Sequence, residues 1–218
     1  MREVLESGRI GTFFDAHDLQ PGQDWNWALR NKAATSALLA VRTDLYSSRE
    51  WCQREMLTAK IHGMPVVVLE AMSIGEMRGS FLMDHTPRIP ARLGADGAWA
   101  TDGLRRAVNL LADAWLHRVL WLRQQALARS DATLSRYWWA PQAPEPSTLA
   151  AWLPDKASPF GASVARMPAL PPGSELRILH PDPPLAADER QVLQQMVALA
   201  GYGALDLTTP RLLAARGA

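Results

Sequence analysis

The sequence predicts an α/β fold in which helices cover both faces of a parallel β-sheet. Two observations carry this prediction. Stretches with the pattern of strands alternate with stretches with the pattern of helices, and the connections are short, which is the order of an open sheet with right-handed crossovers. The strand segments 36–43 and 65–70 are apolar on both faces, as expected when helices cover both sides of the sheet.

The first segments of the chain alternate in this way. Residues 3–7 predict a short helix, and residues 11–15 predict a buried strand. The dipeptide Pro21-Gly22 fits the two central positions of a type II turn. Asp24 is a suitable N-cap for a helix over residues 25–34.

The helix that follows the strand over residues 36–43 has clear start and stop signals. Ser47 and Glu50 have the spacing of a capping box, so we predict a helix over residues 48–62. Gly63 ends it. Glu50 also precedes Arg54 by four residues, which is the favourable order for a helical ion pair.

Glu55, in the second turn of this helix, lacks such an explanation. Its neighbours at three and four residues are Trp51, Cys52, Thr58 and Ala59, and none of them is a cation. It borders an aromatic ring and the apolar side of the helix. A carboxylate there is either a solvated residue at the rim of the helix or an acid placed for a function, and the helix alone leaves both interpretations open.

The segment after the strand over residues 65–70 is less regular. Residues 72–97 are rich in glycine, proline and arginine and predict a loop with one short strand around residues 80–83. Thr101 and Asp102 then cap a long helix. Apolar residues recur along this helix at helical spacing and predict a packing face; they are Leu104, Val108, Leu111, Trp115, Val119 and Leu122.

This pattern predicts three parts of the chain. Residues 1–128 form the first domain, and residues 129–174 form a proline-rich linker or arm. Residues 175–218 form a partial second α/β domain, with a strand at 175–180 and a helix at 187–199. This last part alone is shorter than an α/β fold that stands independently.

The composition excludes several classes of protein. The chain has 218 residues, a formal net charge of +1 and one cysteine, which argues against a general nucleic-acid-binding surface, a disulfide framework and a multi-cysteine metal site. The histidines lack metal-ligand spacing, so we expect no metal. Residues 1–10 lack the apolar centre of a signal peptide, and the long apolar region 104–127 is interrupted by four arginines and an aspartate. We therefore expect a soluble, cytoplasmic protein without a membrane partner.

Six features in order resemble the TIR (Toll/interleukin-1 receptor) domain family. The most specific are Trp-Cys-Gln-Arg-Glu at 51–55, preceded by Tyr-Ser, and an acidic loop with Pro-Gly after an aromatic-rich strand. The six features are Phe-Phe-Asp at 13–15, the loop over 18–25, the apolar strand to Val41, Tyr46-Ser47, the segment 51–55 and Pro-Val-Val-Val at 65–68. The resemblance covers roughly residues 1–128.

The resemblance implies a flavodoxin-like sheet and, as in many bacterial members of the family, cleavage of NAD+ in defence or stress signalling. Glu55 stands at the position of the family's catalytic glutamate. Trp51, Asp15, Leu19 and Trp25 would bind the substrate. NAD+ enters as substrate, with no further cofactor, and the partners are other TIR domains through self-association.

Two other functions are open at this point. The chain could be a non-catalytic TIR–TIR interaction module, in which the loop over residues 18–25 makes contacts and Glu55 is only a rim charge. Alternatively, the function could lie in the segment 175–199, which weakly resembles the start of a nucleotide-sensing α/β domain. Incubation with NAD+ separates the first of these from the enzyme.

The resemblance also predicts an incomplete first domain. A TIR domain normally begins with a strand before its first helix, whereas this chain begins within that helix. The absent strand would be central in the order 2-1-3-4-5. We therefore expect that Met1 is a misplaced start or that the gene is truncated, and that the chain alone is poorly stable and inactive towards NAD+.

The loop over residues 18–25 yields a first prediction. Gly22 occupies the turn position that requires a positive φ, so Gly22→Val should misplace the loop and reduce self-association. In a version extended to an upstream in-frame start, it should also reduce nicotinamide release. Size-exclusion chromatography and a nicotinamide assay measure the two effects. If Gly22→Val assembles and turns over NAD+ like the parent, the loop is not a contact.

Overall fold

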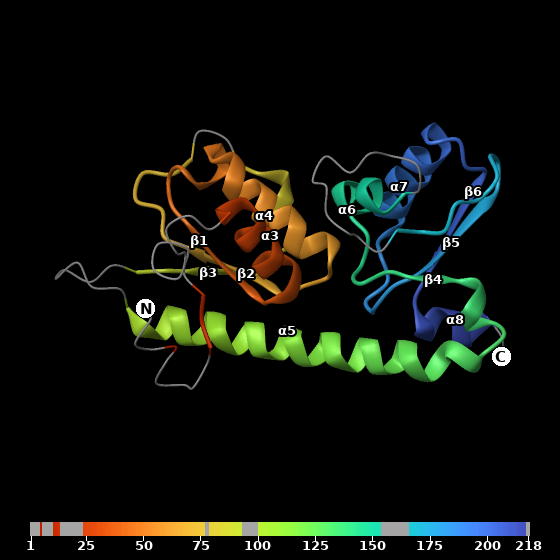
Figure 1. The fold of residues 1–218 in the computed structure, drawn as a ribbon, viewed down its shortest axis with the longest axis horizontal. Helices are drawn as coiled ribbons and strands as arrows, with labels where there is room; N and C mark the ends of the chain where they lie inside the picture. The colour runs from red at the N-terminus through yellow and green to blue at the C-terminus, as the bar shows by residue number, and fades with distance from the viewer. Residues whose placement is uncertain are drawn as a thin grey trace. The chain divides into compact units, whose positions relative to one another are not determined.

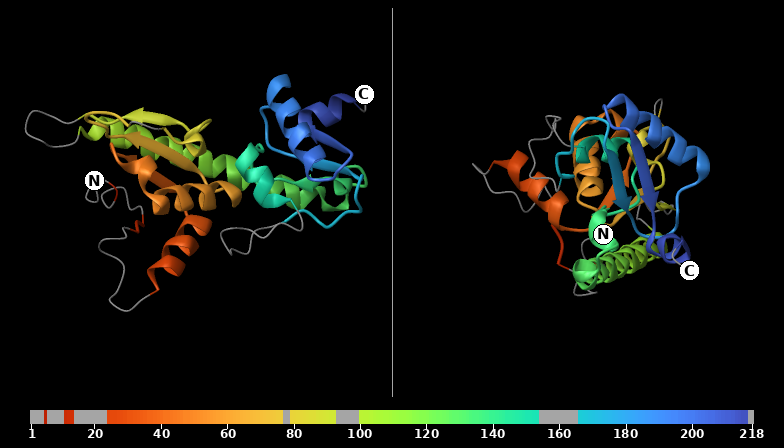
Figure 2. Two further views of the ribbon diagram at one scale, coloured as in Figure 1. Left: turned by 90° about the horizontal axis from the view of Figure 1, so that it is seen from above. Right: turned by 90° about the vertical axis from the view of Figure 1, so that its right-hand side faces the viewer.

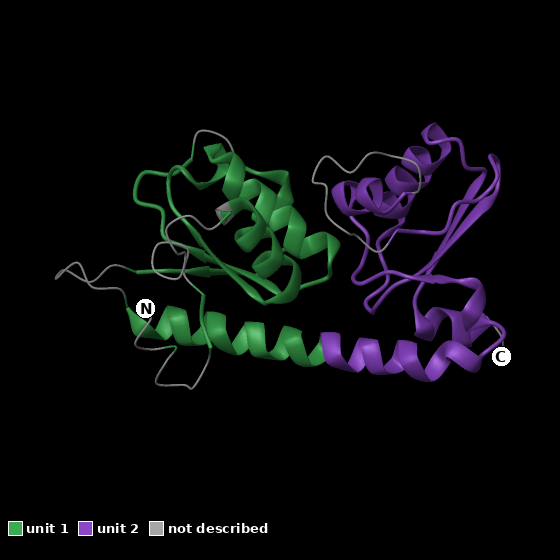
Figure 3. Ribbon diagram, viewed as in Figure 1, with its two compact units in different colours: residues 1–117 green, residues 118–218 purple. Residues whose placement is uncertain are grey.

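The computed structural model contains two three-stranded parallel sheets, each flanked by helices. It confirms the predicted α/β class. The chain divides into two compact units, residues 1–117 and 118–218 (Figure 3). The structure describes residues 5, 11–13, 24–76, 79–92, 100–153 and 166–216.

The sheet of the first unit has the order β1-β2-β3, with β1 (Leu38–Arg42), β2 (Val66–Glu70) and β3 (Arg88–Pro90). All its neighbours are parallel (Figure 1). The central strand β2 is buried along most of its length, whereas β1 is only half-buried. This difference follows from the order, because among the described residues β2 has a strand on each side and β1 has a strand on one side.

Helices lie on both faces of this sheet, as the apolar strands predicted (Figures 1 and 2). One face packs on α5 (Thr101–Leu127), where Val67 and Leu69 join Leu104 and Ala107 in one buried cluster. The other face packs on α4 (Glu50–Ile61), and α3 (Trp25–Thr35) contacts α4. The order α3, β1, α4, β2 confirms the predicted alternation.

The start of α3 confirms the predicted cap, because the Asp24 side chain accepts a hydrogen bond from the Trp27 N–H at 3.2 Å. The predicted capping box of α4 is wrong. Tyr46–Ser48 form a separate 3₁₀ turn, η1, and α4 begins at Glu50 without a side-chain cap. The Ser47 hydroxyl instead donates to Glu76 at 2.7 Å, so it is not available to the helix.

The stop signal and the ion pair of α4 were predicted correctly. Gly63 follows the helix with φ of +61°, a conformation that glycine adopts without steric cost. Glu50 accepts a hydrogen bond from Arg54 and forms the expected pair with it.

The short strand predicted around residues 80–83 is wrong. Phe81–Met83 form a 3₁₀ turn, η2, because the Ser80 hydroxyl accepts a hydrogen bond from the Leu82 N–H and starts a turn there. The third strand lies later, at β3. Residues 11–13 are described and are not in a strand, and the other residues of the strand expected over 11–15 lie outside the described part.

The second unit has its own sheet with the order β4-β5-β6, formed by β4 (Trp138–Trp139), β5 (Glu175–Leu179) and β6 (Ala204–Thr208). Its helices are α6 (Pro146–Trp152), α7 (Ala187–Leu199) and α8 (Pro210–Arg216). The predicted strand and helix correspond to β5 and α7. The segment expected as a linker, 129–174, contributes β4 and α6 to this unit.

Tryptophans occupy the core of the second unit. The Trp121 indole N–H donates to the Ala140 carbonyl at 2.9 Å, and its ring lies 4.8 Å from that of Trp139. The rings of Trp138 and Trp152 are 5.2 Å apart. Trp121 lies on α5 but outside the stripe of apolar residues that predicted its packing face. Only the first part of that stripe, up to Leu111, contacts the core of the first unit.

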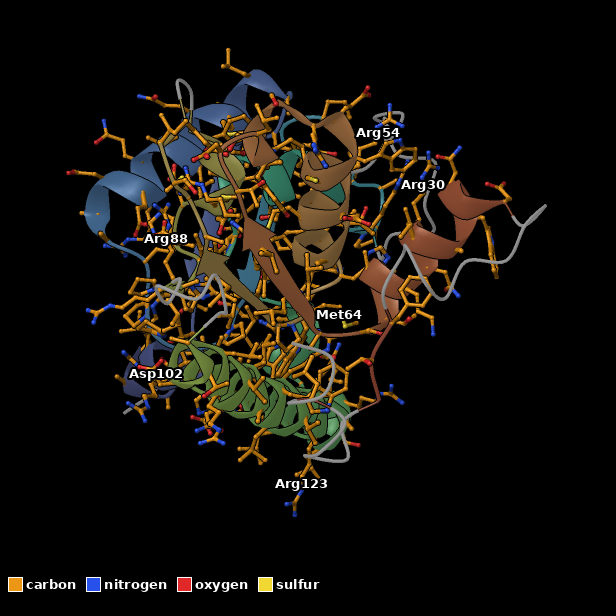
Figure 4. All side chains as sticks on the ribbon, turned by 90° about the vertical axis from the view of Figure 1, so that its left-hand side faces the viewer. Arg30, Arg54, Met64, Arg88, Asp102 and Arg123 are labelled. Atoms are coloured by element: carbon orange, nitrogen blue, oxygen red, sulfur yellow. The ribbon has the colours of Figure 1, made fainter. Side chains whose placement is uncertain are left out.

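The length of α5 does not make it a membrane helix. It has 27 residues, but across the described ranges none of the helices combines the length and apolar character needed to cross a membrane. Charged residues recur along it, and Figure 4 shows the Arg123 side chain extending away from the helix.

Gly203 provides a test of packing in the second unit. A Cβ at this position would lie 2.4 Å from the Gly173 carbonyl oxygen, so Gly203→Ala should destabilise the protein by about 1–3 kcal/mol through overpacking. Gly79→Ala is the control, because a Cβ there meets only an arginine side chain at 3.9 Å. Urea unfolding measures both, and equal stabilities would contradict the close approach.

Candidate functional site

A cavity of about 760 Å³ lies in the first unit along the outer side of β1. Its walls come from β1 and its flanking residues, from α3, α4 and α5, and from Leu5 and residues 11–13. Figure 4 shows α3, which carries Arg30, beyond the edge of β1, and α5 on the other side of the sheet from α4. Most of the lining side chains are apolar, and a few polar groups interrupt them.

Glu55 is one of these polar groups. It is half-buried in the second turn of α4 and lines the cavity together with Cys52. Tyr46 and Arg49, which precede α4, line it as well, as does Lys32 of α3. The helix start therefore brings the predicted catalytic carboxylate to the same cavity as a phenol and two cationic side chains.

Tyr46 is buried, with 7% of its surface exposed. Burial raises the pKa of its phenol well above the usual value, and the Cys52 thiol and the carboxylates of Glu55 and Glu76 raise it further. The phenol therefore keeps its proton at neutral pH. It presents the cavity with a neutral hydroxyl group next to the carboxylate.

Of the other predicted site residues, the structure describes the side chain of Trp51, which does not line this cavity. Trp51 is half-buried and lies under the guanidinium of Arg54 at 5.1 Å. Asp15 and Leu19 lie outside the described residues. Trp25 is the first residue of α3, and its side chain also lies outside the described part.

A buried ion pair lies beside the cavity, at the carboxyl ends of β1 and β2. Arg42, the last residue of β1, donates to Glu76 from Nε at 3.1 Å and from a terminal nitrogen at 2.7 Å. Its other terminal nitrogen donates to Glu70, the last residue of β2, at 3.1 Å. The side chains of Arg42 and Glu76 are only 9% and 4% exposed. Two carboxylates thus balance one buried cation.

Glu76 also fixes the turn before α4. It accepts hydrogen bonds from the Ser47 N–H at 2.9 Å and from the Ser47 hydroxyl at 2.7 Å. Burial alone would raise the pKa of Glu76, but the hydrogen bonds from Arg42 and Ser47 outweigh burial and lower it. The sequence analysis missed this group. The available signal was Arg42, a charge at the end of an apolar strand, which requires a partner when it is buried.

Asp44 ties the same two loops together. Its Oδ1 accepts the backbone N–H groups of Ser73, Ile74 and Gly75 at 2.9–3.1 Å. The hydrogen bonds from Gly75 and Ile74 lower the pKa of Asp44 most. The loops after β1 and β2 are therefore joined at the edge of the sheet where α/β proteins bind ligands.

Metal chemistry gains no support from the described residues, which include no group of three or more histidine, cysteine, aspartate or glutamate side chains arranged to hold an ion. Cys52 is half-buried and does not form a disulfide. The polar side chains that line the cavity thus comprise a carboxylate, a phenol, a thiol, two cations and the hydroxyl groups of Thr12, Ser36 and Thr43.

Comparison with known proteins adds no relative: no family model, no curated protein and no solved structure matches the chain.

The ion pair predicts a pH-dependent contribution to stability. Because the pKa of Glu76 is lowered in the folded protein, its contribution is present above the unfolded value of 4.5 and is lost as the pH falls through the lower folded value. Glu76→Gln should cost about 3 kcal/mol at pH 7, near the lower limit for breaking a buried pair, because Glu70 still faces Arg42.

Denaturant unfolding at pH 7 and at decreasing pH below 4.5 measures this contribution. The difference between parent and Glu76→Gln should shrink in the acid range. Glu50→Gln is the control, because the exposed pair of Glu50 with Arg54 contributes about 0–1 kcal/mol. A Glu76→Gln protein as stable as Glu50→Gln at pH 7 would contradict the role given to this group.

Proposed function

We propose that the chain is a TIR-type NAD+ hydrolase that cleaves the bond between ribose and nicotinamide, with Glu55 as its catalytic carboxylate. The observation that carries the proposal is the position of Glu55 in the cavity of about 760 Å³. This volume lies within the range of small-molecule sites, which are mostly apolar with a few convergent polar groups. The lining of this cavity has that composition.

The sheet supports the proposal at the level of the fold. Three parallel strands in the order β1-β2-β3, with α4 and α5 on opposite faces, are compatible with part of a flavodoxin-like sheet. Ligands of such sheets bind beyond the carboxyl ends of the strands. Thr43, Tyr46 and Arg49 follow the carboxyl end of β1 and line the cavity with Glu55.

The chemistry suits a single carboxylate. Cleavage of the nicotinamide–ribose bond passes through a state in which positive charge develops on the ribose, and a nearby carboxylate stabilises that charge. Nicotinamide leaves as a neutral molecule from a positively charged ring, so no general acid is needed. Water then takes up the ribosyl group, and the products are nicotinamide and ADP-ribose.

One cation of the cavity suits the rest of the substrate. NAD+ carries a diphosphate, and arginine is a side chain that binds phosphate groups readily. Arg49 lines the cavity and is exposed, so its charged group remains accessible. It directly precedes the helix that carries Glu55. The proposal assigns Arg49 the diphosphate and assigns Glu55 the ribose next to nicotinamide.

Replacement of Glu55 tests the proposal. Glu55→Gln keeps the size of the side chain and removes its charge, so nicotinamide release should fall by ~10²–10³-fold, the usual loss when one stabilising group is removed from a transition state. Chromatography of nicotinamide after incubation with NAD+ measures the rate, and circular dichroism checks that the variant is folded.

Glu50→Gln is the matched control, since Glu50 lies in the first turn of the same helix and is paired with Arg54. It should keep the parent rate. Equal turnover in folded Glu55→Gln would refute the catalytic role. A parent protein that releases no nicotinamide, whether dilute or concentrated, would refute the hydrolase proposal for this chain.

A further inference from the structure

The outer edge of β1 has backbone groups without a strand partner in the described part of the chain. Its inner edge is defined by two hydrogen bonds: the Leu38 N–H donates to the Pro65 carbonyl at 2.8 Å, and the Arg42 carbonyl accepts from the Ala71 N–H at 2.8 Å. Successive residues of a strand direct these groups to opposite edges. The N–H and C=O groups of Leu39 and Val41 therefore point outward, into the cavity.

This edge differs from an ordinary exposed edge in its surroundings. Proteins usually protect such edges with short strands, charges or prolines, or cover them with a helix or loop. β1 reads Leu-Leu-Ala-Val-Arg, and α3 lies beyond its edge and lines the cavity. The cavity beside it is walled by α4 on one side and by α5 on the other, with Cys52 and Val108 among the lining residues. The cavity of about 760 Å³ beside β1 is thus bordered by helices on both sides of the sheet.

We propose that the edge of β1 binds an extended peptide segment of a partner protein, which adds a fourth strand to the sheet in this cavity. Addition of a strand supplies partners to the outward N–H and C=O groups of Leu39 and Val41, and pockets beside the strand take its side chains. This binding does not depend on cleavage of NAD+.

The walls define the chemistry of the peptide. Because helices lie on both sides, its side chains must be apolar on both faces, as in a central strand of a parallel sheet. A peptide with five apolar residues matches the five residues of β1 in length. A segment of this length spans about 17 Å.

The charged side chains at the two ends of the cavity indicate which residues should flank the apolar part of the peptide. Lys32 lies in the last turn of α3, just before β1, and Arg49 follows the carboxyl end of β1. Both line the cavity. A peptide with carboxylates at both ends of its apolar residues therefore complements these cations.

The probe is a synthetic peptide of five alternating valines and isoleucines, matching the five residues of β1, with a pair of aspartates at each end. Its control carries lysines instead of aspartates. Hydrogen exchange of the full chain, with and without peptide, measures the contact directly. The amides of Leu39 and Val41 should exchange more slowly with the peptide, whereas those of Leu38 and Ala40, which face β2, should change little.

Two variants separate strand addition from other binding. Val41→Pro removes an outward N–H and leaves the ladder to β2 intact, a position at which an edge strand accepts proline, and it should abolish binding. Lys32→Glu should weaken binding of the aspartate peptide on the order of tenfold, or ~1.4 kcal/mol. Arg105→Glu, on the exposed side of α5, is its control and should bind like the parent.

Unchanged exchange at Leu39 and Val41, or binding that survives Val41→Pro, overturns the proposal. If Val41→Pro does not fold, the comparison of Lys32→Glu with Arg105→Glu decides. Protection of the two amides that appears on concentrating the protein without peptide also overturns it, because a second copy would then be the occupant. Nicotinamide release is measured separately. The peptide-binding result can therefore be interpreted even if the enzyme proposal fails.

Discussion

The buried pair of Arg42 and Glu76 is the interaction on which the arrangement of the first unit depends. A guanidinium that is only 9% exposed must have partners, and it finds them in Glu70 and in Glu76, on the loop after β2. Glu76 in turn binds Ser47 and fixes the turn before α4. One requirement of charge burial thereby sets where α4 starts and where Glu55, in the second turn of this helix, meets the cavity.

The cavity joins two environments that suit different ligands. At the carboxyl end of β1 it is polar, with Tyr46, Arg49 and Glu55 close to the loops that Asp44 and Glu76 hold. Along β1 it is apolar and faces backbone groups. A small charged substrate fits the first environment, and an extended apolar peptide fits the second. The two proposals therefore concern neighbouring regions of one cavity, and a strand along β1 would add a wall to the polar end.

The sequence correctly predicted those features of the fold that depend on local residue patterns. Predictions failed where contacts between residues distant in the sequence determine the structure. Capping residues and apolar runs are local signals. The predictions made from them were therefore correct for the Asp24 cap, the strands β1 and β2 and the helix α7. Ser47 was misassigned because its partner, Glu76, is 29 residues away. Glu55 could be singled out because no cation lies three or four residues from it in the helix, but its place in a cavity formed by segments distant in the sequence could not be predicted. Trp51 was predicted as a substrate-binding residue from the family resemblance, which does not show that its ring lies under Arg54.

The tryptophans of the second unit give it an optical signature of its own. Two pairs of indole rings are held with centroids 4.8 Å and 5.2 Å apart and tilted by 40° and 54°. Chromophores this close and fixed in chiral geometry couple their electronic transitions and produce strong bands in near-ultraviolet circular dichroism, a signal that vanishes when side-chain packing loosens even if helices persist. Loosening of these indole pairs is therefore observable in the intact chain without a label, as a change in a signal to which the tryptophans of residues 1–117 also contribute.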